Sequence, residues 1–463
     1  MDILLTHGYF LQEDEHEKRI MKPYPPLGIL YLSTYLKSKG FFVQVFDSTF
    51  HRKEDFYQFI ENERPPVVGI YCNLMTKLNV LEMIRFCKSR GSVVVLGGPE
   101  PPYYAEEFLE YDADVIVIGE GELTMEEVLA SVSKVGVHRL QGVDGIAFKD
   151  ENGNVIRTSP RQMIKDLDLL PFPDREAIDI EQYISTWRQH HRLGSVSLIT
   201  ARGCPYTCKW CSHGVYGFSH RRRSPQNVVN EVEHLVHRYK PDMMWIADDV
   251  FTINHKWFYQ YADEMKRHDL KVPFECISRA DRLNEDVLKV MADLGCFRIW
   301  FGSESGSQRI LDSMSRGVTV EEVQQATRLA RRYGIEVGLF VMLGYNGETI
   351  SDIEATIDHL KRTQANIFLT TVAYPIKGTA YHQEIESRIT TDLSWEKRTE
   401  RDFKVQGRHS DRFYWFAQRR MTNEVLYHKL ANDRNGKFLE KASVFAKAKI
   451  AQLGMQLTSS SKS

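Results

Sequence analysis

The stretch ARGCPYTCKWCSHG, residues 201–214, holds three of the seven cysteines of this 463-residue chain. Cys204, Cys208 and Cys211 follow SVSLIT, residues 195–200, an apolar run that predicts a buried strand. Spacings of four and three residues put the three sulfur atoms on one tight loop directly after that strand. Thiolates bind zinc and hold iron–sulfur clusters, so this loop predicts a metal site.

Three cysteines leave one metal position without a protein ligand. Three thiolates can hold three irons of a [4Fe–4S] cubane, and the fourth iron is then open to a small molecule. A structural zinc ion would need a fourth ligand at short spacing, for which His213 is the available candidate. Zinc knuckles are not normally built on the first strand of a strand–helix series, so the pattern favours the cluster.

The chain around this loop alternates strands with helices. Its expected strands are residues 195–203, 243–249, 274–280, 297–305, 336–344 and 366–375. Strand–helix alternation predicts a parallel sheet. Six repeats predict a partial (β/α)6 barrel, in which the chemistry lies on loops at the carboxyl ends of the strands.

A first alternating series precedes the barrel. Its expected strands are residues 2–8, 42–48, 67–72, 92–98 and 114–122, which predict a doubly wound, Rossmann-like parallel sheet. Asn152-Gly153 then predicts a β-hairpin in a polar connector. We therefore expect a Rossmann-like domain at 1–140, a linker with a hairpin at 141–190, a partial barrel at 191–385 and a helical, basic segment at 386–463.

Composition is that of a globular protein. The chain is 42% hydrophobic and 26% charged, with a formal net charge of −2, and no apolar run reaches the ~18 residues needed to span a bilayer. An odd number of cysteines with one tight cluster does not suggest a disulfide framework. These features predict a protein of the reducing cytoplasm, and we expect no nucleic-acid partner.

The cysteine motif, Cys-x3-Cys-x2-Cys with Trp210 before the last cysteine, resembles that of the radical S-adenosylmethionine superfamily. The resemblance implies that the amino and carboxylate groups of S-adenosylmethionine ligate the open iron. It also implies an enzyme in which an electron from the cluster cleaves S-adenosylmethionine to methionine and a 5′-deoxyadenosyl radical. An electron donor such as flavodoxin or ferredoxin would supply that electron.

The resemblance extends to other strand ends of the barrel. The S-adenosylmethionine contacts that it implies are Asp248, Asp249, Ser278, Arg279, Glu304, Val341 and Met342. One of the two aspartates would accept from the methionyl ammonium, and Arg279 would hold the carboxylate with its guanidinium fork. The alternative for Arg279 and Glu304 is an internal ion pair across the barrel mouth. Tyr345-Asn346 departs from the family's usual Leu-Pro pair, which puts the role of that loop in doubt.

The first domain resembles the cobalamin-binding domain of one branch of this superfamily, which includes anaerobic magnesium-protoporphyrin ester cyclase-like and cobalamin-dependent methylase-like proteins. The matching stretches are PYPPLGILYLSTYLKSKG, residues 23–40, and VLGGPEPPYYAEEFLEYDADVIVIGEGE, residues 95–122. The implied cobalamin contacts are Asn73, Thr76, Gly97, Gly98, Gly119 and Gly121. The alternatives are that the glycines serve tight turns and that the domain keeps its fold without cobalamin.

The chain departs from the Asp-x-His-x2-Gly motif that supplies a histidine to cobalt in some cobalamin proteins. Asp47 is present, but Thr49 stands at the position of the histidine and His51 lies two residues further on. We therefore expect no histidine ligand below the cobalt.

The C-terminal segment is basic. Residues 395–463 contain fifteen Lys or Arg and seven Asp or Glu, a net +8. Such a segment can make peripheral contact with an anionic membrane or an acidic substrate, or form a solvated helix pair over the barrel's open side. The resemblance implies cobalamin-dependent methylation of an unactivated carbon in a small molecule such as a lipid, a tetrapyrrole or a natural-product intermediate. The alternative is a radical cyclase, oxidoreductase or carbon–carbon coupling enzyme.

Overall fold

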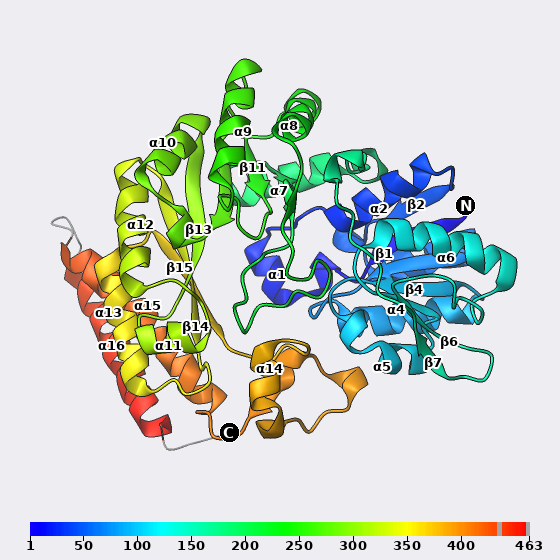
Figure 1. The fold of residues 1–463 in the computed structure, drawn as a ribbon. Helices are drawn as coiled ribbons and strands as arrows, with labels where there is room; N and C mark the ends of the chain where they lie inside the picture. The colour runs from blue at the N-terminus through cyan, green and yellow to red at the C-terminus, as the bar shows by residue number, and fades with distance from the viewer. Residues whose placement is uncertain (433–437, 460–463) are drawn as a thin grey trace.

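The computed structural model describes residues 1–432 and 438–459, which form two α/β units and a helical C-terminal segment (Figure 1). The first unit is built on a parallel sheet in the order β2-β1-β3-β4-β5. Its strands are β1 (Ile3–His7), β2 (Val43–Phe46), β3 (Val67–Tyr71), β4 (Val93–Gly97) and β5 (Val115–Val117). Strand order and direction confirm the doubly wound sheet expected from the sequence.

Helices cover both faces of this first sheet because its strands carry apolar side chains on both sides. One face packs against α2 (Leu27–Ser38) and α6 (Gly121–Val135). The other packs against α3 (Lys53–Glu63), α4 (Lys77–Ser89) and α5 (Ala105–Glu110). Both layers leave the carboxyl ends of the strands free to meet the second unit.

The hairpin at Asn152-Gly153 forms and extends the first sheet. Its strands β6 (Ile146–Lys149) and β7 (Val155–Arg157) are antiparallel, and β6 pairs with β5. Residues of the expected linker thus belong to the sheet, because β6 covers the free edge of β5. The chain then continues through α7 (Ile180–His191) into the second unit.

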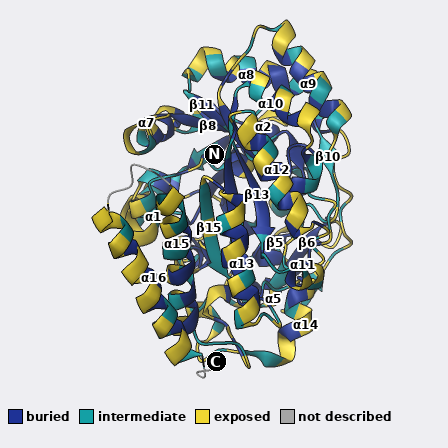
Figure 2. Ribbon diagram, turned by 90° about the vertical axis from the view of Figure 1, so that its left-hand side faces the viewer, coloured by how far each residue is buried: buried dark blue, intermediate teal, exposed yellow. Residues whose placement is uncertain are grey.

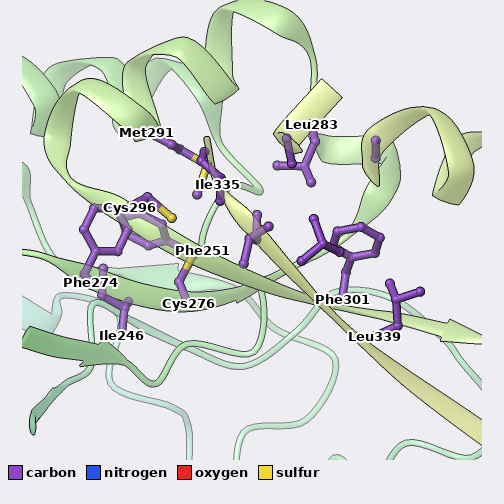
Figure 3. Close-up of a cluster of buried hydrophobic side chains, with 14 of the residues drawn as sticks. Ile246, Phe251, Phe274, Cys276, Leu283, Met291, Cys296, Phe301, Ile335 and Leu339 are labelled. Atoms are coloured by element: carbon purple, nitrogen blue, oxygen red, sulfur yellow. The ribbon is translucent and has the colours of Figure 1, made fainter. Parts of the chain in front are cut away.

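The second unit is a six-stranded parallel sheet in the order β8-β11-β12-β13-β14-β15, the expected partial barrel. Its strands are β8 (Ser195–Leu198), β11 (Met243–Ile246), β12 (Phe274–Ser278), β13 (Cys296–Glu304), β14 (Glu336–Leu343) and β15 (Ile367–Val372). Its helices are α8 (Pro225–Tyr239), α9 (His255–Arg267), α10 (Glu285–Leu294), α12 (Val320–Arg332) and α13 (Ile350–Thr363). Side chains such as Phe251, Phe301 and Leu339 fill the core between these strands and helices (Figure 3).

The segment after β15 has two parts. Residues 380–408 contain α14 (Ala380–Ile385), β16 (Ile389–Thr390) and β17 (Lys404–Val405). In Figure 1 they lie below the loop of residues 203–220, which carries the three cysteines and is called the cluster loop below, and they reach the first unit. The helices α15 (Asp411–Asn432) and α16 (Phe438–Thr458) pack together outside the barrel beside α13. In the described part of the chain, no helix is both long and apolar enough to span a bilayer.

Candidate cluster and cofactor site

The three clustered cysteines lie on a loop whose base is a small antiparallel pair. The expected strand 195–203 divides into β8 and β9 (Ala201–Arg202), because β9 leaves the barrel sheet to pair with β10 (Arg221–Arg222). The loop between β9 and β10 begins at Gly203, whose φ is +85° and where a side chain would collide with the carbonyl of Ser219. This base holds the loop at the carboxyl end of the first barrel strand.

Cys208 is the most buried of the three thiols and faces two arginines. The Arg316 Nη1 atom lies 3.4 Å from its sulfur and the Arg279 Nη1 atom 3.8 Å. A hydrogen bond from Cys211 and then the Arg316 guanidinium lower the pKa of Cys208, whereas burial raises the pKa of Cys204. Arginines beside a thiolate stabilise its charge, which suits a cluster ligand. Arg316 was not predicted from the sequence.

The loop residues next to the cysteines are held by neighbouring segments. The Trp210 Nε1 atom donates to the Tyr374 carbonyl at 2.8 Å. His213, the fourth ligand that a zinc site would need, stacks on Phe218 with ring centroids 4.1 Å apart. Among the described residues no three potential ligands converge on the position of one ion.

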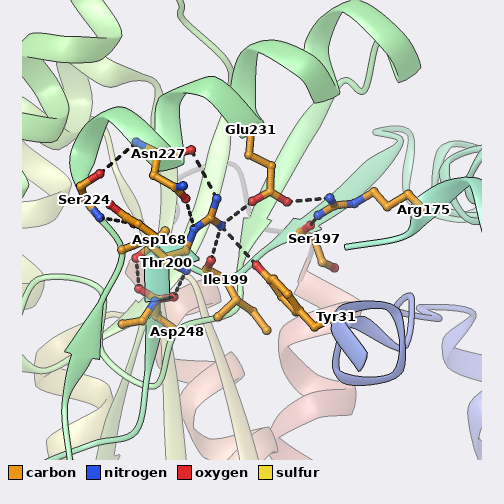
Figure 4. A network of polar contacts seen from close by, with 12 residues as sticks. Tyr31, Asp168, Arg175, Ser197, Ile199, Thr200, Ser224, Asn227, Glu231 and Asp248 are labelled. Atoms are coloured by element: carbon orange, nitrogen blue, oxygen red, sulfur yellow. Dashed lines mark hydrogen bonds and ion pairs between the residues drawn. The ribbon is translucent and has the colours of Figure 1, made fainter. Parts of the chain in front are cut away.

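The two aspartates after β11 have different surroundings. Asp248 is 1% exposed and accepts from the Thr200 and Ala201 amides, the Thr200 hydroxyl and Arg222; Figure 4 shows its contacts with Thr200. Its carboxylate therefore fixes the end of β8, and the contact of Asp248 with S-adenosylmethionine stays a prediction. Asp249 is exposed. Desolvation and the neighbouring Asp248 raise its pKa.

Two further predicted contacts are occupied by internal bonds. Ser278 is buried and hydrogen-bonded to Thr252. Arg279 donates from Nε to Asp281 at 2.9 Å and from Nη2 to the Arg316 carbonyl at 3.0 Å, and lies 3.7 Å from the Tyr206 ring centroid. Arg279 thus braces the cluster loop, and it could bind a carboxylate only by exchanging these partners.

Glu304 ends β13 in a strained conformation. Its φ is +52°, in the left-handed region that favours glycine, and the pairing of β13 with β14 shifts register between Gly302 and Glu304. Its Oε1 atom lies 3.6 Å from Arg316 Nε, and burial raises its pKa. Arg279 and Glu304 both make internal ion pairs, as the alternative expects, but with other partners: Arg279 with Asp281 and Glu304 with Arg316. A side chain at Gly302 would collide with both Glu304 and Arg316.

The predicted adenine contacts on β14 point to opposite sides of the sheet. Val341 belongs to the core between the strands and the outer helices, whereas Met342 packs in a cluster with Trp210, Tyr345 and Tyr381. Successive residues of a strand alternate between faces. Met342 therefore faces the cluster loop, whereas Val341 faces the core, and the contact of either residue with the cofactor stays a prediction.

A buried ionic network joins the base of the cluster loop to the first sheet. Arg202 Nη1 donates to Glu120 Oε1 and Arg221 Nη1 to Glu120 Oε2, each at 2.7 Å, and Arg202 Nη2 donates to Glu122 at 2.5 Å. The four side chains are at most 12% exposed. We call these four residues the interdomain clamp. The sequence pattern points to the glycines on either side of Glu120 but not to the carboxylates of Glu120 and Glu122.

The glycines at the edge of the first sheet occupy positions with different structural requirements. Gly98, with φ +109°, would collide with the Cys72 carbonyl if it carried a side chain. Gly119, with φ +90°, has its Cβ position 3.7 Å from the Val215 carbonyl of the cluster loop. Gly121 begins α6, and Gly97 has no other atom nearer than 4.0 Å to its Cβ position. Open space at Gly97 fits a ligand that approaches the backbone.

The loops after β3 and β4 carry further candidate contacts for cobalamin. Asn73 and Thr76 are hydrogen-bonded to each other at 3.0 Å, and Thr76 is 3% exposed. Their contact with cobalamin stays a prediction. Glu100 Oε1 is buried without a hydrogen-bond partner among the described residues. Burial, then Glu400, raises the pKa of Glu100 to about 7. This acceptor fits an amide side chain of a corrin.

The loop that lacks the cobalt-ligating histidine is closed by internal contacts. Asp47 accepts from His7 Nε2 at 2.9 Å and from Tyr183 at 2.7 Å. His51 is exposed, its Nδ1 atom lies 2.9 Å from the Asp47 carbonyl, and its ring packs on Phe46. The absence of a histidine ligand to cobalt stays a prediction.

Two family models match the chain. The radical SAM superfamily model matches residues 198–360, and the B12-binding domain model matches residues 20–129. These matches imply a [4Fe–4S] cluster, S-adenosylmethionine and cobalamin as cofactors.

Similar proteins include a methyltransferase and a cyclase. The chain is 29% identical over 397 residues to an uncharacterized methyltransferase, PH0819, of Pyrococcus horikoshii, covering 83% of this chain and 84% of that one. It is 27% identical to the anaerobic magnesium-protoporphyrin IX monomethyl ester cyclase of Rubrivivax gelatinosus, covering 72% of this chain and 61% of the cyclase.

A solved structure has the same fold. The radical S-adenosylmethionine methyltransferase TsrM of Kitasatospora setae, with cobalamin and a [4Fe–4S] cluster bound, superposes with a TM-score of 0.70. The match has 19% sequence identity and covers 85% of this chain and 77% of TsrM.

Proposed function

We propose that this chain, a member of the radical SAM superfamily with an N-terminal B12-binding domain, is a cobalamin-dependent methyltransferase that acts on an unactivated carbon of a small molecule. When bound, the cluster and S-adenosylmethionine supply a carbon-centred radical, and cobalamin carries a methyl group. The observation that carries the proposal is the interdomain clamp. It ties the cysteine loop to Gly119 at the edge of the B12-binding sheet, where the two cofactors would share one substrate.

The protein's own contribution is to hold the cluster and to orient S-adenosylmethionine. Cys204, Cys208 and Cys211 would ligate the cluster, and Arg316 stabilises the Cys208 thiolate. Asp249 is the carboxylate left to accept from the ammonium group of S-adenosylmethionine, and Met342 would flank its adenine. Glu304 would reach the ribose or the amino group from its strained turn.

The substrate site that we propose lies beside β15. A hollow of about 670 Å³ is lined by residues 370–374 at the end of β15 and by the segment that carries Arg401, Lys404 and Arg408. Tyr374 connects it to Trp210, the neighbour of Cys211, with ring centroids 5.4 Å apart. The C-terminal segment thus supplies much of the lining, which supports a role in choosing the substrate.

A cyclase or other radical reaction is the second candidate, favoured by the similarity to the magnesium-protoporphyrin cyclase. The two candidate reactions are distinguished by giving the reconstituted protein S-adenosylmethionine, with and without cobalamin, and measuring the S-adenosylhomocysteine and 5′-deoxyadenosine that form. Methyl transfer predicts S-adenosylhomocysteine that forms only when cobalamin is present. Formation of 5′-deoxyadenosine without S-adenosylhomocysteine would contradict the methyltransferase and favour the second candidate.

A further inference from the structure

Helix α16 carries apolar side chains on two opposite faces. Val444, Ala448, Ala451 and Met455 form one face, which is buried, and α16 packs against α15. The other face holds Leu439, Ala446, Ile450, Leu453 and Leu457. The last four of these follow the i, i+4, i+7, i+11 spacing of a single helix face. We call this second set the outer stripe.

The outer stripe is open to solvent. Leu439 is 82% exposed, Ile450 65%, Leu453 59% and Leu457 83%. Figure 2 shows α16 at the surface, with many exposed residues along its length. Single exposed apolar residues are ordinary, but a continuous stripe of large ones marks a surface that contacts something else. We therefore expect the outer stripe to contact a partner molecule or surface.

Charge indicates which occupant fits. Between residues 438 and 458 the chain has three lysines, at 441, 447 and 449, and one acid, Glu440. Two copies of this chain meeting along α16 would bring like charges together, whereas an anionic surface would be attracted. Basic residues beside a stripe of large apolar residues are typical of helices that lie in a membrane interface.

Exposed aromatic and basic side chains also occur at the start of α15, next to α16. Phe416 of α15 packs against Gly454 of α16, so the start of α15 lies beside the end of α16. There Trp415 is 48% exposed, with the Arg419 guanidinium 3.9 Å from its ring centroid. Tryptophan and arginine are suited to the boundary between headgroups and acyl chains.

We propose that α16 docks this protein on an anionic phospholipid surface, with the outer stripe entering the headgroup boundary and Lys447 and Lys449 meeting lipid phosphates. In Figure 1, α16 lies at the outer edge of the molecule, on the far side of the barrel from the first sheet. This inference is independent of the proposed reaction.

The test is co-sedimentation of the full-length reconstituted protein with vesicles of phosphatidylcholine, either pure or mixed with phosphatidylglycerol. We expect binding to the mixed vesicles that falls with salt. The double variant Ile450→Glu, Leu453→Glu should reduce that binding by about tenfold or more, because carboxylates replace apolar groups at the interface. Leu169→Glu is the matched control, since Leu169 is 77% exposed and lies outside α16, and it should bind as the parent does.

Three results would each overturn the proposal. The parent protein could fail to bind the mixed vesicles, or the double variant could bind as well as the parent. The third is a parent that sediments as a dimer and becomes monomeric in the double variant, because the occupant would then be a second copy. A thermal unfolding scan of each variant excludes misfolding, and Lys447→Glu with Lys449→Glu should separately weaken the salt-dependent part of binding.

Discussion

Arg202 and Glu120, eighty-two residues apart in the sequence, form a buried ion pair at 2.7 Å that joins the base of the cluster loop to the edge of the first sheet. Arg221 reaches the other oxygen of the same carboxylate from the paired strand. One glutamate thus binds both strands that carry the loop. The placement of the loop relative to the sheet depends on this carboxylate.

Removing one partner of the clamp should destabilise the fold strongly. Arg202→Met leaves Glu120 and Glu122 buried with fewer donors, and breaking such a pair costs about 3–5 kcal/mol. Urea unfolding of the variant measures this cost. Arg139→Gln is the control, because Arg139 and its partner Glu151 are 64% and 59% exposed, and such a pair contributes at most about 1 kcal/mol. Equal effects of the two substitutions would contradict the clamp.

Asp249 and Asp248 should differ as contacts of S-adenosylmethionine. Asp249→Asn should leave the cluster intact and weaken binding of S-adenosylmethionine on the order of tenfold, because a charge-assisted hydrogen bond is lost. The pKa of Asp249 is raised, so binding should also weaken as the pH falls and the carboxylate is protonated. Equilibrium dialysis across pH checks both effects.

Asp248→Asn provides the contrast. Its effect should appear in the free energy of unfolding, since Asp248 fixes the end of β8. An Asp249→Asn variant that binds S-adenosylmethionine as the parent does would remove Asp249 from the site.

Much of this architecture is predictable from the sequence. Each of the eleven apolar runs forms a strand, because buried parallel strands need continuous apolar stretches, although β5 and β8 end five residues before their predicted bounds. The cysteine spacing likewise locates the loop. What the pattern missed are contacts between distant segments: Arg316 at Cys208, Glu120 with Arg202, and the break between β8 and β9. The different surroundings of Asp248 and Asp249 were not predictable either, because a strand-end carboxylate looks the same in sequence whether it faces a ligand or the backbone of its neighbour.

His359 should make stability depend on pH. It is 2% exposed and hydrogen-bonded to Ser303, the residue before Glu304 at the end of β13, and burial lowers its pKa from 6.5 to about 4. Between these values the unfolded chain binds a proton that the native chain does not. The free energy of unfolding therefore keeps the full contribution of neutral His359 above pH 6.5 and falls by about 3 kcal/mol as the pH drops to 4.

Urea unfolding at several pH values measures this slope. His359→Gln should flatten it, whereas His190→Gln, at an exposed position, should not. A slope unchanged in His359→Gln would assign the pH dependence to other groups.

Cobalamin should bind without a histidine ligand. Thr49 occupies the ligand position and His51 packs on Phe46, away from that register. Electron paramagnetic resonance of protein loaded with cob(II)alamin should lack nitrogen splitting, and His51→Ala should give the same spectrum. Nitrogen splitting that disappears in His51→Ala would show that this loop supplies the ligand after all.

The central claim is that the cysteine loop holds a cluster that cleaves S-adenosylmethionine. Its most direct test is chromatography of 5′-deoxyadenosine after anaerobic reconstitution with iron and sulfide, reduction, and addition of S-adenosylmethionine. The account predicts that the parent protein forms 5′-deoxyadenosine, that Cys204→Ala, Cys208→Ala and Cys211→Ala lose both iron and product, and that Cys296→Ala keeps both. A parent protein that assembles its iron and sulfide but leaves S-adenosylmethionine uncleaved, or a triple cysteine variant that retains iron, would contradict it.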